Sequence, residues 1–368
     1  VWKQDPNICQ IGGSTYKSLG EALEKAKNGD TIEMLVASYD LSREANKDYS
    51  PALTISKNIT LTTNKELVGA KCTIVKDFYK TEDYTTSDAI TVANGATLNL
   101  QGISLDGQNW ILQAAQGQTG SLVKVEQGGT LNLGKDANGY YPTLRQNSNL
   151  KSDDQKGNGG AINNAGTLNI NLAEFYDNKA LNGGAIYNTG TMTLNDGVIY
   201  NNAAEDNGSL TYGLGGGICN VGEAVCNLFG GTIGTGKPDA KGNTSMEGNR
   251  ASFDGGGVYR QDKAEIFVKG NLDVRGNTSG LGSQSNIYTG NYVDGGSTTP
   301  YKLHLAGDLS QEYDNQAICI TPASDISQAG DVFAVIDNKT TTTKPVNAFR
   351  QDSHQLGMYG ARTASADQ

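Results

Sequence analysis

Several residue types are scarce in this 368-residue chain, and each shortage excludes a class of protein. Seven prolines exclude collagen and a proline-rich linker protein. The wholly apolar runs are only a few residues long, whereas a membrane-spanning helix needs about 20, so we expect no membrane insertion in this segment. Basic residues are also in deficit. With 29 Lys and Arg against 39 Asp and Glu the net charge is −10, which argues against nucleic acid as a partner.

Cysteine and histidine are too few and too scattered for the sites they usually build. His304 and His354 are the only histidines, and neither adjoins a recognisable nucleophile motif, so we predict no serine–histidine catalysis. The cysteines suggest neither a disulfide framework nor a C-x-x-C site for zinc or redox chemistry. There are five of them: Cys9, Cys72, Cys219, Cys226 and Cys319.

Glycine and asparagine, by contrast, are abundant. The chain has 48 glycines and 35 asparagines, which together make up nearly a quarter of it. These two residues tolerate positive φ best and therefore serve in turns. A chain so rich in turn residues consists of many short elements, which excludes a bundle of long helices.

A repeat explains this composition. Residues 158–181 and 182–205 align without a gap and are identical at 12 of 24 positions. Their opening GG-[AG]-[IV] returns at Gly216-Gly217-Ile218 and at Gly256-Gly257-Val258. A search for repeats precedes any other interpretation, because stacked copies of one small unit form a class of folds of their own.

Each repeat contains three short runs in which apolar residues alternate with polar ones, separated by Gly or Asn. In the second copy the runs are 185–187, 191–194 and 198–200. One such unit cannot bury its few apolar residues, but stacking it on a copy of itself buries a continuous core. Pairing each strand with its equivalent in the next repeat predicts a single right-handed parallel β-helix of about 10–12 rungs. Recurring asparagines then form a structural ladder, for which we select Asn178, Asn202, Asn249 and Asn277.

The N-terminal residues 1–50 differ from the repeats and predict a cap. Ser18 and Glu21 form a capping box, and the apolar residues that follow lie on one helical face until Asn28-Gly29 ends the helix. Residues 30–36 indicate the first strand. An amphipathic helix over this strand would cover the open edge that a stack of strands exposes. We assign residues 51–340 to the β-helix and 341–368 to a C-terminal strand and tail.

The repeats carry a family resemblance. Gly159–Ile162 and Gly183–Ile186, with Phe175-Tyr176-Asp177-Asn178, resemble the GGA[ILV] and FxxN repeats of chlamydial-type polymorphic outer membrane proteins. The stretch from Ser18 to Ile32 is similar to the capped start of secreted pectin-lyase-like β-helix proteins. The first resemblance implies a surface-displayed passenger used in adhesion, and the second implies a fold that also hosts carbohydrate-active enzymes.

The catalytic residues of those enzymes do not stand out in the sequence. Glycoside hydrolysis needs two suitably spaced carboxylates, and the only Asp pair, Asp153-Asp154, lies in a polar insertion. A lyase would need clustered Asp with an arginine base, but Arg250, Arg260 and Arg275 lie at the C-terminal end of the repeats. The calcium-binding motif G-G-x-G-x-D is missing as well, so we predict no cofactor, although an adventitious or structural calcium stays open.

The alignment of the repeats also places two cysteines and a binding side. It makes Cys219 the counterpart of outward-facing Tyr187 and Cys226 that of inward-facing Leu194, which disfavours a disulfide between them. Segments 134–157, 203–213 and 234–254 each precede a glycine pair, so we expect them to leave the stack at one corner, where insertions often bind partners. Aromatic residues in these segments are candidate ligand contacts, namely Tyr140, Tyr141 and Tyr212, and Trp110 in an earlier irregular segment is a further one.

These observations favour a non-catalytic function. We interpret the chain as a mature or excised piece of an exported bacterial cell-surface protein whose export signal was removed or lies outside it. It would be an adhesin-like rod whose side loops bind a host-surface protein or a polysaccharide. The alternatives are a polysaccharide lyase or glycoside hydrolase of the pectin-lyase-like fold, and a structural spacer in a longer surface protein.

Overall fold

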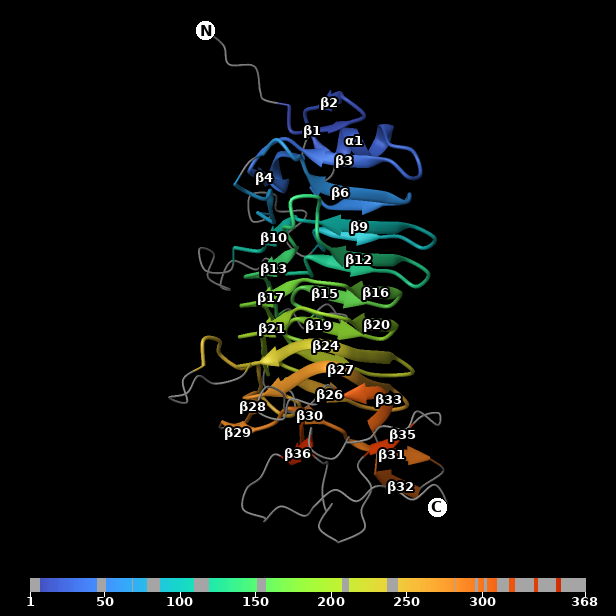
Figure 1. Cartoon of the computed structure of the whole chain (residues 1–368), viewed down its shortest axis with the longest axis vertical. Coiled ribbons are helices and arrows are strands. Elements are labelled where there is room, and N and C mark those ends of the chain that lie inside the picture. Colours follow the sequence, from blue (N-terminus) through green and yellow to red (C-terminus); the bar gives the residue numbers. More distant parts are fainter. Residues whose placement is uncertain are drawn as a thin grey trace.

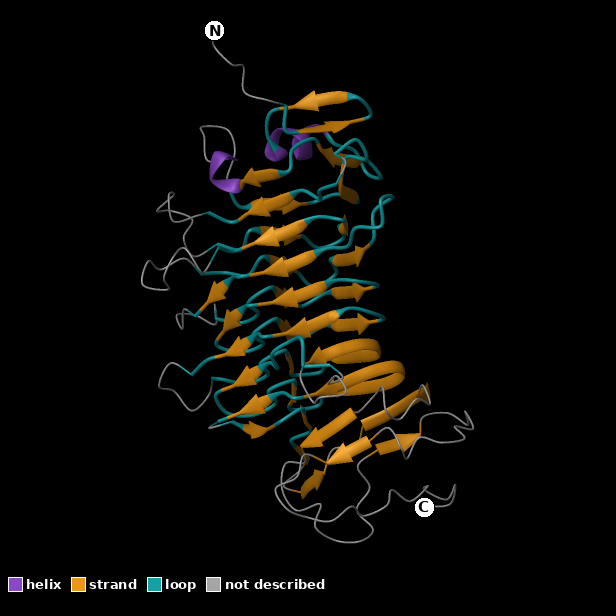
Figure 2. Cartoon of the chain, turned by 60° about the vertical axis from the view of Figure 1, so that its left-hand side comes forward, coloured by secondary structure: helices purple, strands orange, loops and turns teal. Residues whose placement is uncertain are grey.

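Parallel strands stacked along the long axis make up most of the molecule (Figure 1, Figure 2). The computed structural model describes residues 7–44, 51–67, 69–77, 87–108, 119–150, 157–206, 212–236, 244–280, 282–294, 297–300, 303–309, 318–321, 334–336 and 349–351. Among these residues there is one α-helix and one 3-10 turn, η1 (Leu41–Glu44). The all-β content and the long parallel sheet are compatible with a β-helix.

The strands lie in three columns, and a rung is one strand from each column. The first column contains β5 (Leu53–Ile55), β8 (Ile90–Val92), β11 (Val123–Val125), β15 (Ile162–Asn164), β19 (Ile186–Asn188), β23 (Ile218–Asn220), β26 (Val258–Arg260), β30 (Ile287–Tyr288), β34 (Ile318–Thr321) and β36 (Phe349–Gln351). The second contains β3 (Thr31–Met34), β6 (Ile59–Thr63), β9 (Thr97–Gln101), β12 (Thr130–Gly134), β16 (Thr167–Ile170), β20 (Thr191–Leu194), β33 (Leu303–Leu309) and β35 (Ala334–Ile336). The third contains β4 (Ser38–Asp40), β7 (Thr73–Val75), β10 (Ser104–Asp106), β13 (Thr143–Arg145), β17 (Glu174–Tyr176) and β21 (Val198–Tyr200).

Two long strands belong to both the second and the third column. They are β24 (Val225–Gly234) and β27 (Glu265–Arg275). Each continues through the position where other rungs turn, and their pairing shifts register between Leu228 and Gly230. We expected two separate strands in the second of these segments, at 264–268 and 271–274. The bend is absorbed within one strand because a glycine, Gly230 or Gly270, stands at that point.

The 24-residue repeat is visible directly in the strand pairing. Ile162 pairs with Ile186, and Phe175 pairs with Ile199, so equivalent side chains lie directly above one another. All four are fully buried, while their neighbours along each strand face outward. Burying one such side chain contributes about 1.5–3 kcal/mol, which a single rung with few apolar residues cannot accumulate but a stack can.

A small parallel sheet follows the third column at the next corner. It contains β14 (Ser148–Asn149), β18 (Lys179–Ala180), β22 (Ala203–Ala204), β25 (Arg250–Ala251), β28 (Thr278–Ser279) and, antiparallel at its end, β29 (Ser283–Gln284). The glycine pairs of the repeat lie beside this sheet, where backbones of successive rungs approach closely. A Cβ built on Gly184 would lie 2.2 Å from the carbonyl oxygen of Gly216. Only glycine fits there, which explains the pair.

The N-terminal cap contains the expected helix and a hairpin that we did not expect. Helix α1 (Leu19–Lys25) begins at Ser18, whose side chain accepts a hydrogen bond from the Glu21 amide at 3.1 Å. The helix ends at Lys25, before the predicted stop, because Ala26 is already extended. Strands β1 (Cys9–Ile11) and β2 (Ser14–Tyr16) form the hairpin, and β1 pairs antiparallel with β3. The hairpin therefore covers the edge of β3 that we assigned to the helix.

The structure differs in two places from our expectation about the insertions. Strand β13 lies within segment 134–157 and pairs with β10 and β17, so part of that segment belongs to the stack. Strand β25 lies within segment 234–254, and the connection there precedes β25, whereas in segment 203–213 the connection follows β22. The segments therefore leave at two corners and not at one. At the C-terminal end, β31 (Asn291–Asp294) and β32 (Ser297–Pro300) form an unexpected antiparallel hairpin.

The cysteine alignment is right for one residue and wrong for the other. Cys219 pairs with Tyr187, as predicted. Cys226 pairs with Met192, and not with Leu194, because the turn between β23 and β24 is two residues longer than the turn between β19 and β20. Cys226 still faces inward, and both Cys219 and Cys226 are buried free thiols.

Candidate functional site

The outer surface of the third column carries a connected group of polar and aromatic side chains. Along this column Asp106, Arg145, Tyr176 and Tyr200 occupy equivalent positions on successive rungs. Two residues earlier in each strand, Thr143 and then Glu174 form a parallel row. Because alternate residues of a strand share a face, these two rows lie on the same outer surface.

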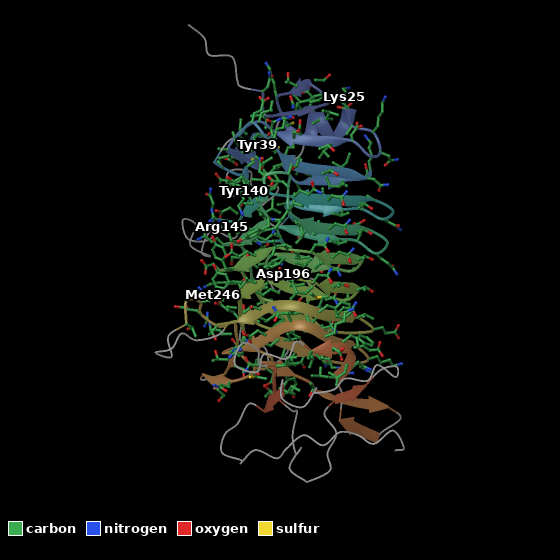
Figure 3. The ribbon with its side chains drawn as sticks, viewed as in Figure 1. Lys25, Tyr39, Tyr140, Arg145, Asp196 and Met246 are labelled. Atoms are coloured by element: carbon green, nitrogen blue, oxygen red, sulfur yellow. The ribbon has the colours of Figure 1, made fainter. Side chains whose placement is uncertain are left out.

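Arg145 connects the residues of this group, and Figure 3 shows it at the left-hand side of the stack, near Tyr140. Its Nε and Nη2 atoms each lie 3.0 Å from Oδ2 of Asp106, and its Nη1 donates to the hydroxyl of Tyr176 at 2.8 Å. Burial alone would lower the pKa of the guanidinium, but the hydrogen bond to Tyr176 and the charge of Asp106 raise it further than burial lowers it. Arg145 is therefore a fixed positive charge held between a carboxylate and a phenol.

The two tyrosines extend the network by one more rung. The rings of Tyr176 and Tyr200 stack with centroids 5.2 Å apart and planes at 21°. The Tyr200 hydroxyl donates to Oε1 of Glu174 at 3.1 Å. Burial and the neighbouring Glu174 carboxylate both raise the pKa of Tyr200, so its hydroxyl stays protonated and remains a donor. Ring stacking and this hydrogen bond fix both side chains in place.

Lys71 joins the network from the turn before β7. Its Nζ donates to the hydroxyl of Thr143 at 2.6 Å and to the carbonyl of Tyr141 at 2.8 Å, and it lies 5.2 Å from the centroid of the Tyr141 ring. Burial lowers the pKa of Lys71, with Glu174 acting in the opposite direction. Tyr141 is 37% exposed and is the one large hydrophobic side chain among the described residues that is classed as exposed.

We call this group the Arg145 face. It comprises Lys71, Asp106, Tyr141, Thr143, Arg145, Glu174, Tyr176 and Tyr200. It presents a guanidinium, an ammonium, two carboxylates and three phenol rings within neighbouring rungs. Such a surface can bind a polar ligand through hydrogen bonds and through contact with ring edges and faces.

The predicted ligand contacts do not all lie together in the structure. Tyr141 belongs to the Arg145 face, and Tyr140 precedes it in a turn where Asp136 accepts from the Tyr140 amide at 2.9 Å. Tyr212 is half-buried in the connection that precedes β23 and is not part of the Arg145 face. Trp110 lies outside the described residues, as do Asp153-Asp154 and His354.

The four selected asparagines are linked in an unbroken chain of side-chain hydrogen bonds. The Nδ2 of Asn178 donates to Asn202 at 3.0 Å, Asn202 to Asn249 at 2.9 Å, and Asn249 to Asn277 at 2.8 Å. Asn286 continues the chain from Asn277 at 2.9 Å. All are at most 1% exposed, and they also bond the turn backbone, so their role is structural.

A second buried ladder was missed by the sequence analysis. Asn164 donates to Asn188, and Asn188 to Asn220, each at 2.7 Å, on the inner side of the first column. The next residue in this position is Arg260, which is 2% exposed and donates to the Ala264 carbonyl at 2.7 Å. The signal was available, since Asn164 and Asn188 are identical positions of the two repeats.

The outer side of the first column holds a second group of tyrosines. Tyr187, Cys219, Tyr259 and Tyr288 follow one another on successive rungs. The rings of Tyr259 and Tyr288 are parallel within 3° with centroids 5.3 Å apart. Burial raises the pKa of Tyr187 to about 12. Among its described residues this column has no ion pair like that of Arg145 and Asp106, so it offers a comparison with the Arg145 face.

Residues that would indicate metal or membrane chemistry are not gathered in the described part of the chain. No three His, Cys, Asp or Glu side chains there are grouped to hold a metal ion. No helix among the described residues is long and apolar enough to span a bilayer. The chain matches no protein-family model, no curated protein sequence and no solved structure. The arguments about function therefore depend on the chain's own geometry.

Sequence reasoning missed most of the Arg145 face. We counted arginines only toward the C-terminal end of the repeats and overlooked Arg145, because segment 134–157 looked like an insertion. Tyr176 and Tyr200 were noted only as part of the repeated motif. Both flank an inward apolar residue, Phe175 or Ile199, so the alternation of the third run could have placed them on the outer surface.

Proposed function

We propose that this chain is a non-catalytic binding rod of the bacterial cell surface, exported and adhesin-like. In this proposal the stacked rungs close into a right-handed parallel β-helix, as in the polymorphic outer membrane and pectin-lyase-like proteins that the repeats resemble. The Arg145 face binds the ligand. The observation that carries the proposal is the continuous hydrogen-bonded and stacked network from Lys71 to Tyr200 on one outer surface.

A polysaccharide is the ligand that this surface fits best. Sugars present hydroxyl groups that bond to charged and phenolic side chains, and apolar ring faces that pack against aromatic rings. The positions of this row repeat at strand spacing, about 4.8 Å, along the axis. A polymer lying along the axis would meet one side chain of the row at each rung. A host-surface protein is the other partner that we consider.

A polysaccharide lyase or glycoside hydrolase is the second candidate, because Asp106, Glu174 and Arg145 share one face. The geometry supports it less. Asp106 is engaged by Arg145 at 3.0 Å, and Glu174 accepts from Tyr200 at 3.1 Å, so both carboxylates are engaged in holding neighbouring side chains. A spacer function would need only the ladders and would leave this network without a use.

Binding and turnover on one panel of acidic and neutral polysaccharides, with and without calcium, test the proposal. We expect binding to at least one polysaccharide, no release of reducing ends and no unsaturated uronate. Tyr176→Ala combined with Tyr200→Ala should weaken binding at least tenfold. The matched control is Tyr288→Ala, which removes a stacked tyrosine from the first column and should leave binding unchanged.

The outcomes separate the three candidates. Turnover abolished by Glu174→Gln or Asp106→Asn would replace the binding function with an enzyme. Binding lost equally in the Tyr288→Ala control would move the site away from the Arg145 face. If no polysaccharide of the panel and no host-surface protein binds, the spacer function remains.

A further inference from the structure

One lysine is buried in the rung next to Asp106 of the Arg145 face. Lys76 follows β7 and is 1% exposed, and its Nζ donates to the carbonyls of Thr119 and Gly120, each at 2.7 Å. Lysine is almost never fully buried, because removing an ammonium from water is costly. Burial lowers the pKa of Lys76 to about 7, with the charge of Asp88 acting in the opposite direction. A large share of this lysine is therefore a neutral amine at physiological pH.

A buried carboxamide lies next to this amine. Asn147 is 1% exposed, and its Nδ2 donates to the carbonyl of Gly160 at 2.6 Å and to that of Gly120 at 2.8 Å. Gly120 thus accepts from both Lys76 and Asn147. Two donors on one acceptor at these lengths lie within roughly 5.5 Å of each other.

A glycine that packs closely against Asn147 lies on the rung between the two residues. The Lys76 amide donates to the Asp106 carbonyl, and the Gly107 amide to the Arg145 carbonyl, so Gly107 occupies the intermediate rung. A Cβ at Gly107 would lie 2.5 Å from Cα of Asn147. Only glycine leaves room there, and the space between Lys76 and Asn147 is free of any side chain from that rung.

We propose that Lys76 and Asn147 join in an intramolecular isopeptide bond. The lone pair of the neutral Nζ attacks Cγ of Asn147, the bond from Cγ to Nδ2 breaks, and ammonia leaves. The proton that Nζ loses passes to the departing Nδ2, with the Asp88 carboxylate as the carrier. The charge of Asp88 acts on Lys76, and its Oδ1 accepts from the Ser121 amide, next to Gly120, at 2.7 Å.

The reaction needs no oxidant or cofactor. Holding a desolvated amine beside its electrophile supplies most of what such a step requires, because proximity is worth several orders of magnitude in rate. The product amide retains one N–H, which can still donate to the Gly120 carbonyl. The bond would tie the rung of β7 to that of β13 across the connections that follow β7 and β10. This inference does not depend on what the Arg145 face binds.

Intact-mass measurement of the full chain tests the proposal, followed by tandem mass spectrometry of tryptic peptides. We expect a mass lower than that of the sequence by one ammonia, and a branched peptide that joins Lys76 to Asn147. Lys76→Met and Asn147→Ala should both show the full mass. Asp88→Asn should still fold and should form the bond at least tenfold more slowly.

Succinimide formation at Asn-Gly sequences also releases ammonia. The Lys76→Met variant distinguishes a succinimide from the isopeptide bond. A loss of mass that persists in Lys76→Met, or that maps to an Asn-Gly pair, would overturn the proposal. So would the full sequence mass in wild-type protein after prolonged incubation at neutral pH. In that case Lys76 serves as a buried hydrogen-bond donor.

Discussion

Removing Asn202 should show how much one ladder position contributes to stability. Its Nδ2 donates to the Asn249 side chain and to the carbonyls of Phe175 and Tyr200, at 2.8 to 3.0 Å. Its Oδ1 accepts from the amide and the side chain of Asn178 at 3.1 and 3.0 Å. Asn202→Ala therefore removes five buried hydrogen bonds at once.

The magnitude follows from the groups that lose their partner. The Asn178 amide and two carbonyls would be buried with fewer bonds, at about 1–3 kcal/mol for each group left unsatisfied. For these three groups we expect the free energy of unfolding to fall by about 3–9 kcal/mol. The matched control is Asn195→Ala, because Asn195 makes an equivalent bond to Asn171 at 3.0 Å on the exposed surface. That change should cost less than about 0.5 kcal/mol.

Urea unfolding of both variants gives the comparison, and hydrogen exchange localises it. A stack of repeats can open in segments, so a global midpoint can conceal a local loss. We expect the amides of Asn178 and Asn202 to exchange faster in Asn202→Ala, with the first rungs unaffected. Equal midpoints for the two variants, together with unchanged exchange at Asn178, would refute a stabilising role for the ladder.

Three further predictions concern the core, a corner and the buried lysine. Ile186→Asp places an unpaired charge at a fully buried position and should lower the melting temperature by more than 10 °C; an unchanged melting curve would contradict the inward assignment. Gly184→Ala should destabilise the chain by several kcal/mol because its Cβ meets a backbone carbonyl, whereas Gly134→Ala, with open space around it, should not; urea midpoints compare them. In Asn147→Ala the Lys76 amine stays unlinked, and burial lowers its pKa in the folded chain to about 7, whereas its usual value is 10.5. Between pH 7 and pH 10.5 the unfolded chain therefore binds more protons than the folded chain. Stability should then be level below pH 7 and rise by up to about 1.4 kcal/mol per pH unit toward pH 10, a rise that adding Lys76→Met should abolish.

The stacking of the repeats was predictable because the signal is local and exact. A 24-residue period with alternating runs determines which residues pair, and Ile162 with Ile186 is the outcome. Strand β13 was not predictable in this way. Its three residues lie between polar stretches, and only pairing with β10 and β17 makes them a strand.

The Arg145 face was hidden for a similar reason. The contact between Arg145 and Asp106 joins residues 39 positions apart in the chain, and it exists only once both strands are in register. Connections of irregular length between β10 and β13 break the period that would have aligned them. The repeat thus identifies the residues that face inward. The function we propose depends on residues that face outward, in the least regular part of the stack.

The buried asparagine ladders also have a direction. From Asn178 to Asn286, and from Asn164 to Asn220, every Nδ2 donates toward the C-terminal neighbour, so the amide dipoles add head to tail as peptide dipoles do in a helix. The outer row runs the opposite way, since Asn169 donates to Asn132 and Asn132 to Asn99. Aligned amides polarise one another, so each bond strengthens the next. A duplicated repeat would continue this polarity on both sides, which makes gain or loss of whole 24-residue units the easiest way for such a chain to change its length.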